Sequence, residues 1–158
     1  MLKKLLSNPF AIFVVLLTCT VLLILPYINK STMKKEIIST INAPAPIGPY
    51  SQAVKTGGIL YTSGQIAIDP VYNTYTPSTI EEETTLVMSN LKAVLEGAKM
   101  NFGHVVKTTI FLADMNDFPK VNAIYASYFT DNFPARETVQ VSVLPKNAKV
   151  EISMIAAE

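Results

Sequence analysis

The sequence predicts an α+β domain in which two helices pack on one face of a mixed β-sheet. From Glu36 onward, short segments rich in β-branched residues are separated by proline and glycine, as is typical of strands joined by turns. Two segments, beginning near Ser78 and near Asp117, instead carry apolar residues at helical spacing. Because these helices lie between strands and hairpins are expected at both ends, helices and strands should form separate layers. At 158 residues, the chain is long enough for one domain with a buried core.

Ahead of this domain, which we place at residues 33–158, residues 1–32 are expected to form one hydrophobic helix. Residues 9–28 carry no charge, and about 20 apolar residues suit a single membrane-spanning helix. We therefore expect a membrane anchor; lysines flank it on both sides and so favour neither orientation. An alternative remains open, because Met33 is a plausible start: translation from it would give a cytoplasmic protein without this segment.

The first part of the domain is predicted to contain three strands. They are expected at residues 37–41, 51–55 and 58–63. The second and third form a hairpin across Thr56 and Gly57. Between the first two, three prolines within residues 42–50 restrict the chain to an extended loop. After the third strand, Gly64 would allow a ligand to approach the backbone closely.

The first helix is expected to begin near Ser78, after a turn-rich connection at residues 69–77. Ser78 and Glu81 match a capping box, and residues 81–83 are three glutamates near the positive end of the helix dipole. We interpret these glutamates as capping residues rather than catalytic ones. One apolar stripe should pack against the sheet. It consists of Ile80, Val87, Leu91, Val94, Leu95 and Ala98.

Residues 105–112 are predicted to form the next strand, and Asp117 with Pro119 opens the second helix. Its expected buried face is Val121, Ile124, Tyr125, Tyr128 and Phe129. Two final strands, at 138–144 and 149–156, alternate polar and apolar residues and are expected to pair as a hairpin. Since the chain has no third layer, we expect the other face of the sheet to be covered by self-association.

Composition excludes several kinds of site. One cysteine and one histidine cannot form a metal site or a disulfide within the chain. Neither glycine-rich phosphate-binding motif occurs. Beyond residue 35 the chain carries eight basic and twelve acidic side chains, which argues against nucleic-acid binding. Chemistry must therefore come from arginine, carboxylates, hydroxyls and backbone groups.

Arg136 is the only arginine in the chain and follows Pro134 at the start of a β-rich segment. A guanidinium can hold a carboxylate at two points, which a lysine cannot do. Arg136 is therefore a candidate binding group for a carboxylate. The alternative is an ordinary surface arginine at a strand start.

Several motifs in order carry a family resemblance. They are Ala45-Pro46-Ile47-Gly48-Pro49-Tyr50-Ser51-Gln52-Ala53, Thr62-Ser63-Gly64-Gln65-Ile66, Val106-Lys107-Thr108-Thr109-Ile110-Phe111-Leu112, Asp117-Phe118-Pro119-Lys120-Val121-Asn122, Phe133-Pro134-Ala135-Arg136, and Leu144-Pro145-Lys146 with Val150-Glu151-Ile152. Over residues 34–158 the chain resembles the Rid family, the reactive enamine/imine deaminases. Several such matches in order are far more specific than any single one.

The resemblance implies a chorismate-mutase-like fold and a homotrimer with clefts between subunits. It implies a hydrolase acting on C=N bonds, a 2-iminobutanoate/2-iminopropanoate deaminase that converts 2-enamine and 2-imino acids to 2-oxo acids and ammonia without metal or cofactor. Arg136 would hold the substrate carboxylate, and Glu151 would position or activate the attacking water. The implied substrate-binding residues are Tyr50, Ser63, Gly64, Asn122 and Thr138. Thr138 stands where some active members have cysteine.

Two other functions stay open. One is a non-catalytic protein of this fold that binds a small carboxylate, and the other is an endoribonuclease or translation inhibitor, against which the acidic balance weighs. The expected hairpin also has a consequence for the site. It would put Glu151 opposite about Ser142, roughly 20 Å from Arg136 at ~3.3 Å per residue. We therefore expect the two residues to meet only across a subunit boundary.

Overall fold

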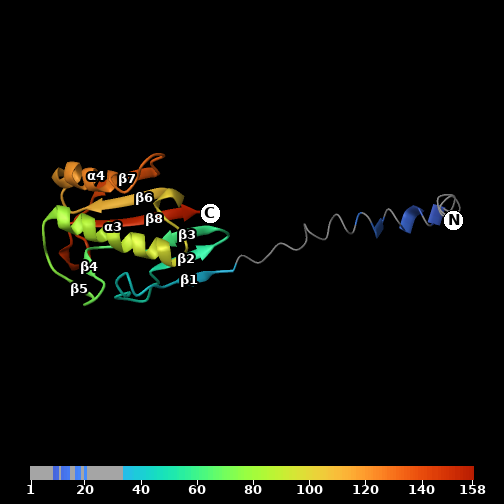
Figure 1. Ribbon diagram of the computed structural model, residues 1–158, viewed down its shortest axis with the longest axis horizontal. Coiled ribbons are helices and arrows are strands. Elements are labelled where there is room, and N and C mark those ends of the chain that lie inside the picture. The colour runs from blue at the N-terminus through green and yellow to red at the C-terminus, as the bar shows by residue number, and fades with distance from the viewer. Residues whose placement is uncertain (1–8, 11, 15–16, 19, 21–33) are drawn as a thin grey trace. The chain divides into compact units, whose positions relative to one another are not determined.

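The C-terminal strand lies in the middle of the sheet rather than at its edge. The computed structural model describes residues 9–10, 12–14, 17–18, 20 and 34–158, and the chain divides into two units, residues 1–34 and 35–158. In the second unit, six strands form one sheet in the order β1-β2-β3-β8-β6-β7, and β4 pairs with β5 (Figure 1). The elements are β1 (Glu36–Ile38), β2 (Ala53–Thr56), β3 (Ile59–Thr62), β4 (Ile68–Asp69), β5 (Thr74–Tyr75), α3 (Ile80–Gly97), β6 (Val105–Leu112), α4 (Phe118–Ala126), β7 (Ala135–Gln140) and β8 (Val150–Ala157), with short 3₁₀ turns at Phe102–His104, Met115–Asp117 and Pro145–Asn147.

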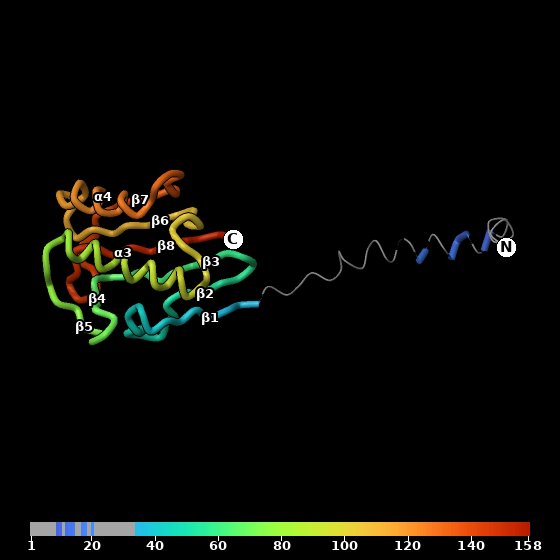
Figure 2. The backbone as a smooth tube through the Cα atoms, in the orientation of Figure 1, coloured from blue at the N-terminus to red at the C-terminus, as the bar shows by residue number. Residues whose placement is uncertain are grey.

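The sheet is mixed, as the sequence predicts. The β2–β3 hairpin is confirmed, with Thr56 opposite Ile59. β6 and β7 are parallel, and the other neighbouring strands are antiparallel. Because parallel neighbours need a crossover, α4 connects β6 to β7. Figure 2 shows β1 and β7 at opposite edges of the sheet.

The predicted hairpin between residues 138–144 and 149–156 is wrong, because β6 lies between β7 and β8. The chain leaves β7 after Gln140 and passes the end of β6 before entering β8. Val141 N donates to Leu112 O at 2.9 Å, and Ala113 N donates to Lys149 O at 2.9 Å. A tight turn could not span the width of an intervening strand, so these residues form a long connection instead.

The helix α3 carries the core. Its predicted stripe is confirmed, with every member at most 4% exposed. The helix packs on β8, whose buried residues alternate along the strand. Figure 1 shows α3 lying along β8. The capping box is shifted by one residue from the prediction. Thr79 accepts from Glu82 N at 3.2 Å, and the Glu82 carboxylate accepts from Thr79 N at 3.0 Å.

Glu83 is not a capping residue, because its side chain is fully buried. Its carboxylate accepts from Tyr75 Oη at 2.9 Å and from Lys149 N at 2.9 Å. Burial, together with the hydrogen bond to Glu83, raises the pKa of Tyr75 to about 12. Glu83 therefore ties the helix to the connection before β8, which explains a carboxylate in the core.

The sheet face opposite the helices carries a polar cluster beside exposed apolar side chains. Glu137 accepts from Lys107 Nζ and from Thr109 Oγ1, both at 2.8 Å. On the same face, Val139 is 43% exposed and Tyr61 is 46% exposed. No element among the described residues covers this face.

The predicted membrane anchor is corrected by the structure. A helix needs about 20 apolar residues to cross a bilayer, and no helix among the described residues is long and apolar enough to do so. We therefore withdraw both the anchor and the membrane location. Within residues 9–28, positions 11, 15–16, 19 and 21–28 lie outside the described residues, and the others are helical.

Candidate active site

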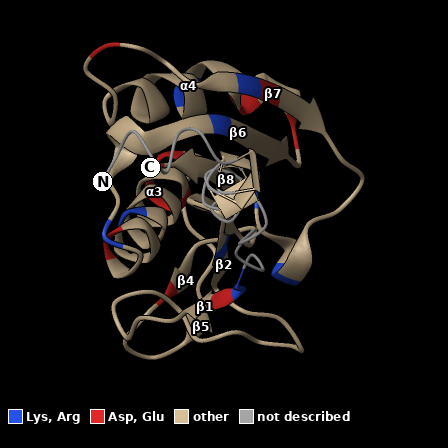
Figure 3. Ribbon diagram, turned by 90° about the vertical axis from the view of Figure 1, so that its right-hand side faces the viewer, with Lys and Arg blue, Asp and Glu red and all other residues tan. Residues whose placement is uncertain are grey.

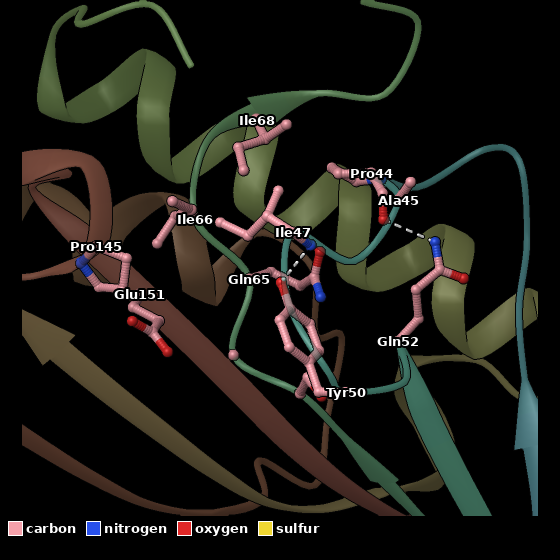
Figure 4. A pocket seen from close by; sticks show the side chains of 12 residues that line it. Pro44, Ala45, Ile47, Tyr50, Gln52, Gln65, Ile66, Ile68, Pro145 and Glu151 are labelled. Atoms are coloured by element: carbon pink, nitrogen blue, oxygen red, sulfur yellow. Dashed lines mark hydrogen bonds between the residues drawn. The ribbon is translucent and has the colours of Figure 1, made fainter. Parts of the chain in front are cut away.

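A cavity of about 320 Å³ opens beside Glu151 (Figure 4). Three segments that are distant in the sequence form its walls: the proline-rich loop before β2, the residues that follow β3, and the connection into β8. The lining residues are Pro44, Ala45, Ile47, Tyr50, Gln52, Ser63, Gly64, Gln65, Ile66, Ile68, Pro145 and Glu151. Four predicted site residues, Tyr50, Ser63, Gly64 and Glu151, thus share one cavity.

Gln52 holds the loop that carries Tyr50. Its side chain is only 3% exposed. Its Oε1 accepts from Thr40 N at 2.7 Å, and its Nε2 donates to Ala43 O at 3.0 Å. The same Nε2 donates to Pro44 O at 2.8 Å (Figure 4). The amide therefore satisfies backbone groups of a loop that has no sheet partner. Gln52 belongs to one of the motifs that carry the family resemblance, but no role was predicted for it; a glutamine shortly after three prolines was the available signal.

Tyr50 projects into the cavity from the same loop. Its hydroxyl accepts a hydrogen bond from Ile47 N at 3.2 Å, so the ring closes a small turn (Figure 4). The Tyr50 side chain is 46% exposed. Tyr50 is thus positioned by its own loop but open to a ligand or a second molecule.

An irregularity in the pairing of β3 with β8 brings Gly64 against Glu151. Tyr61 pairs with Ile155, and the next pair is Gln65 with Ile152. The intervening residues bulge outward, and Ser63 Oγ donates to Ser51 O at 2.6 Å. A Cβ atom on Gly64 would overlap the Glu151 carboxylate. Any other residue at position 64 would therefore displace the Glu151 carboxylate from its observed position.

Glu151 is a half-buried carboxylate on β8, and burial raises its pKa above the ordinary value. Among the described residues, no lysine, arginine or histidine lies within ion-pair distance of it. A carboxylate of raised pKa, without a cation, is a stronger base than an exposed one. Glu151 is therefore suited to take a proton from a bound water.

Arg136 lies in a different pocket, on β7. Its guanidinium stacks on two rings of α4, with Cζ 4.9 Å from the Tyr125 centroid and 5.6 Å from the Phe118 centroid. Tyr125 is held in turn by donating its hydroxyl proton to Thr108 Oγ1 at 3.1 Å. Arg136 forms no ion pair with any acidic side chain in the described part of the chain. Such a guanidinium is fixed on its faces while its donors remain available for a ligand.

The pocket beside Arg136 has a volume of about 380 Å³ and is also lined by Asn122. Thr138 faces the same side of the sheet two residues further on. Its Oγ1 is buried and has no hydrogen-bond partner among the described residues. It borders a further pocket of about 360 Å³ next to Phe118. The predicted site residues thus fall into two groups, one around Glu151 and one around Arg136.

One chain does not bring the two groups together. Arg136 is paired with Thr108 of β6, and Glu151 is paired with Phe111 of β6. From strand spacings of ~4.8 Å and rises of ~3.3 Å, their Cα atoms lie roughly 14 Å apart. Thr108 is buried under the helices, whereas Glu151 belongs to the alternate, partly exposed set of β8, so the two side chains leave the sheet on opposite faces. The separation differs from the roughly 20 Å of the expected hairpin, yet it too prevents contact with one small molecule.

The described residues contain no group of three or more histidine, cysteine, aspartate or glutamate side chains placed to hold a metal ion. The chemistry available at these pockets is that of a guanidinium, a desolvated carboxylate, hydroxyls and amides.

Comparison of the sequence and the fold with those of known proteins shows which family the chain belongs to. Residues 40–158 match the family model described as Endoribonuclease L-PSP. A crystal structure of a Rid-family protein from Yersinia pestis matches with a TM-score of 0.77 and 50% identity, covering 79% of this chain and 100% of that one. The chain belongs to the Rid family.

Other members of the Rid family are similar over the same region. A RutC family protein of Pyrococcus horikoshii is 50% identical over 122 residues, which are 77% of this chain and 97% of that protein. The mouse 2-iminobutanoate/2-iminopropanoate deaminase is 46% identical over 128 residues, 81% of this chain and 95% of that enzyme. Rid relatives at this level of identity thus carry different names, one of which states a deaminase activity.

Proposed function

We propose that this Rid protein hydrolyses reactive 2-enamine and 2-imino acids, such as 2-aminoacrylate and 2-iminopropanoate, to 2-oxo acids and ammonia. The observation that carries the proposal concerns Arg136 and Glu151. Among the described residues, the Arg136 guanidinium has no acidic partner, and the desolvated Glu151 carboxylate has no basic partner. A 2-imino acid has a carboxylate that the Arg136 guanidinium can bind and an electrophilic carbon that a water molecule activated by Glu151 can attack. A relative that is 46% identical is named as such a deaminase. No metal or cofactor has a step in this chemistry.

Each group has one role. Arg136 binds the substrate carboxylate at two points, and Asn122 and Thr138 border the same ligand. Glu151 takes a proton from water as the water oxygen bonds to C2. This proton passes to the imine nitrogen and gives a carbinolamine. As the C2–N bond breaks, the hydroxyl proton of the carbinolamine also passes to nitrogen, so ammonia leaves and the 2-oxo acid forms. An enamine first gains a proton at C3 and loses one from nitrogen, which converts it to the imine.

The proposed site takes its two halves from two subunits of a homotrimer. A small imino acid cannot span roughly 14 Å between residues on opposite sheet faces, as estimated from strand geometry. In a cyclic oligomer, the Arg136 pocket of one protomer can meet the Glu151 cavity of the next. The uncovered sheet face, with Val139 and Tyr61 exposed, supports such an interface.

The test is a trapping assay. An amino-acid oxidase generates the imino acid in situ, and semicarbazide traps what the protein has not hydrolysed. Wild type should lower semicarbazone formation, and Arg136→Ala and Arg136→Lys should lose this effect, because lysine cannot bind a carboxylate bidentately. Lys92→Ala, an exposed change on α3, serves as control. If wild type binds substrate analogues but does not change the trapping rate, the protein is a binding protein rather than a deaminase.

The family description also names an endoribonuclease. Figure 3 shows the lysine and arginine positions of the folded domain spread over several elements and interspersed with aspartate and glutamate. Beyond residue 35, acidic side chains outnumber basic ones by twelve to eight. RNA binding depends on clustered cations, so the charge distribution favours the deaminase. RNA cleavage that survives Arg136→Ala would contradict this choice.

A further inference from the structure

The cavity beside Glu151 is larger than a three-carbon substrate requires. It measures about 320 Å³. 2-Iminopropanoate has six non-hydrogen atoms. Even at the ~30 Å³ that a whole water molecule occupies, they would fill no more than about 180 Å³. In the proposed site, moreover, the carboxylate lies toward Arg136 of another subunit. Space is therefore left for a longer substituent on C2.

That space is bounded by an apolar wall, which consists of Ile47, Ile66 and Ile68 (Figure 4). Ile66 and Ile68 are 7% and 5% exposed and are supported from behind by Leu144 and Ala148. Ile47 lies opposite them on the proline-rich loop and is 47% exposed. Figure 4 shows the three isoleucine side chains near one another, with Tyr50 beside Ile47 and Glu151 to one side of them.

We propose that the apolar wall receives an aliphatic side chain of the substrate, so that imino acids with longer aliphatic chains are hydrolysed in preference to three-carbon ones. This inference rests on the proposed deaminase function. Around C2, the carboxylate is directed to Arg136 and the attacking water to Glu151, which leaves the remaining substituent to the rest of the cavity. Each methylene buried there should favour hydrolysis by about fourfold, from ~0.8 kcal/mol per methylene.

The same cavity disfavours charged side chains. Among the described residues that line it, Glu151 is the charged one, and the others are apolar side chains, amides, a glycine, a serine and a tyrosine. A second carboxylate would be desolvated next to Glu151 without a cation to balance it. An ammonium group would pair with Glu151 and lower the basicity that the reaction uses. The wall therefore selects by charge as well as by length.

The test compares imino acids generated in situ from alanine, norvaline, leucine and glutamate, with hydrolysis measured by semicarbazide trapping. The expected order of rate constants for wild type is leucine above norvaline above alanine, with the glutamate product slowest. Ile47→Ala should reduce hydrolysis of the leucine product by roughly three- to tenfold and that of the alanine product by less than about twofold. Val71→Ala, at an exposed apolar position in the turn between β4 and β5 and outside the cavity, should change neither. Because Ile47 is on the rim, its truncation leaves the core intact.

Four outcomes would overturn the inference. Equal rates for the alanine, leucine and glutamate products would show that the wall does not select. An equal loss for all products in Ile47→Ala would show that Ile47 positions the loop or a subunit contact and not the substrate. If wild type hydrolyses only the alanine product, the deaminase proposal stands and the wall is not a side-chain site. If wild type hydrolyses none, the deaminase function itself fails, and this inference with it.

Discussion

Mixing two inactive variants should restore activity if the site is shared between subunits. Arg136→Ala removes the carboxylate-binding group, and Glu151→Gln removes the base while keeping the shape of the side chain. Each variant alone should lose roughly 10²- to 10⁴-fold in rate, the range for a positioned acid or base. In a mixed oligomer, some sites receive Arg136 from one protomer and Glu151 from its neighbour, and these sites are intact.

The expected recovery follows from the geometry. After random exchange at equal amounts, about one site in four combines two intact residues, so the mixture should regain about a quarter of wild-type activity. If instead both residues acted within one chain, every chain would carry one lesion and recovery would be absent. The opposite sheet faces of Arg136 and Glu151 predict the first result.

The assay is imine hydrolysis after joint unfolding and refolding of the two variants. Native mass spectrometry of an isotopically labelled variant verifies that subunits have exchanged. Each variant refolded alone is the control. Activity that stays at the level of the parents, in samples shown to contain mixed oligomers, would refute the shared site.

Two further predictions concern carboxylates that differ in environment. Burial raises the pKa of Glu151, so between the ordinary and the raised pKa the folded state binds more protons than the unfolded state. The stability of the wild type should therefore fall across that range as pH rises. By calorimetry, the melting temperature of Glu151→Gln should rise increasingly above that of the wild type across the same range. Glu81→Gln is the matched control of opposite sign, because the backbone N–H of Glu81 and then Lys120 lower the pKa of this carboxyl. That variant should therefore lose stability relative to the wild type as pH rises. Equal melting temperatures of Glu151→Gln and the wild type at every pH would contradict the burial of Glu151. Glu83→Ala should lower the free energy of unfolding in urea by about 3 kcal/mol, because it leaves buried hydrogen-bond partners unsatisfied. Glu96→Ala, at an exposed position on α3, should lose less than about 0.5 kcal/mol; a similarly small loss for Glu83→Ala would disprove its structural role.

Local patterns in the sequence determined much of this protein. The stripe of α3 and the β2–β3 hairpin depend on neighbours within a few residues, so periodicity and turn residues are enough to predict them. Arg136 stood out by composition alone, and the family followed from motifs in order. Local information also misled where two interpretations fit equally well, since Ser78 with Glu81 and Thr79 with Glu82 both satisfy the spacing of a capping box.

Only the tertiary structure decided the order of the strands and the hydrogen-bond partners of individual polar side chains. Strand order depends on contacts between segments far apart in sequence, and the alternation of residues 138–144 is the same whether the neighbour is β6 or β8. Glu83 connects α3 to the segment before β8 because Tyr75 and Lys149 lie within hydrogen-bond distance of it in the folded chain. Gln52 holds the proline-rich loop because backbone carbonyl groups of that loop lie around its side chain. The same physics separates Arg136 from Glu151: pairing with β6 fixes their distance, and the two-residue period of a strand sends their side chains to opposite faces.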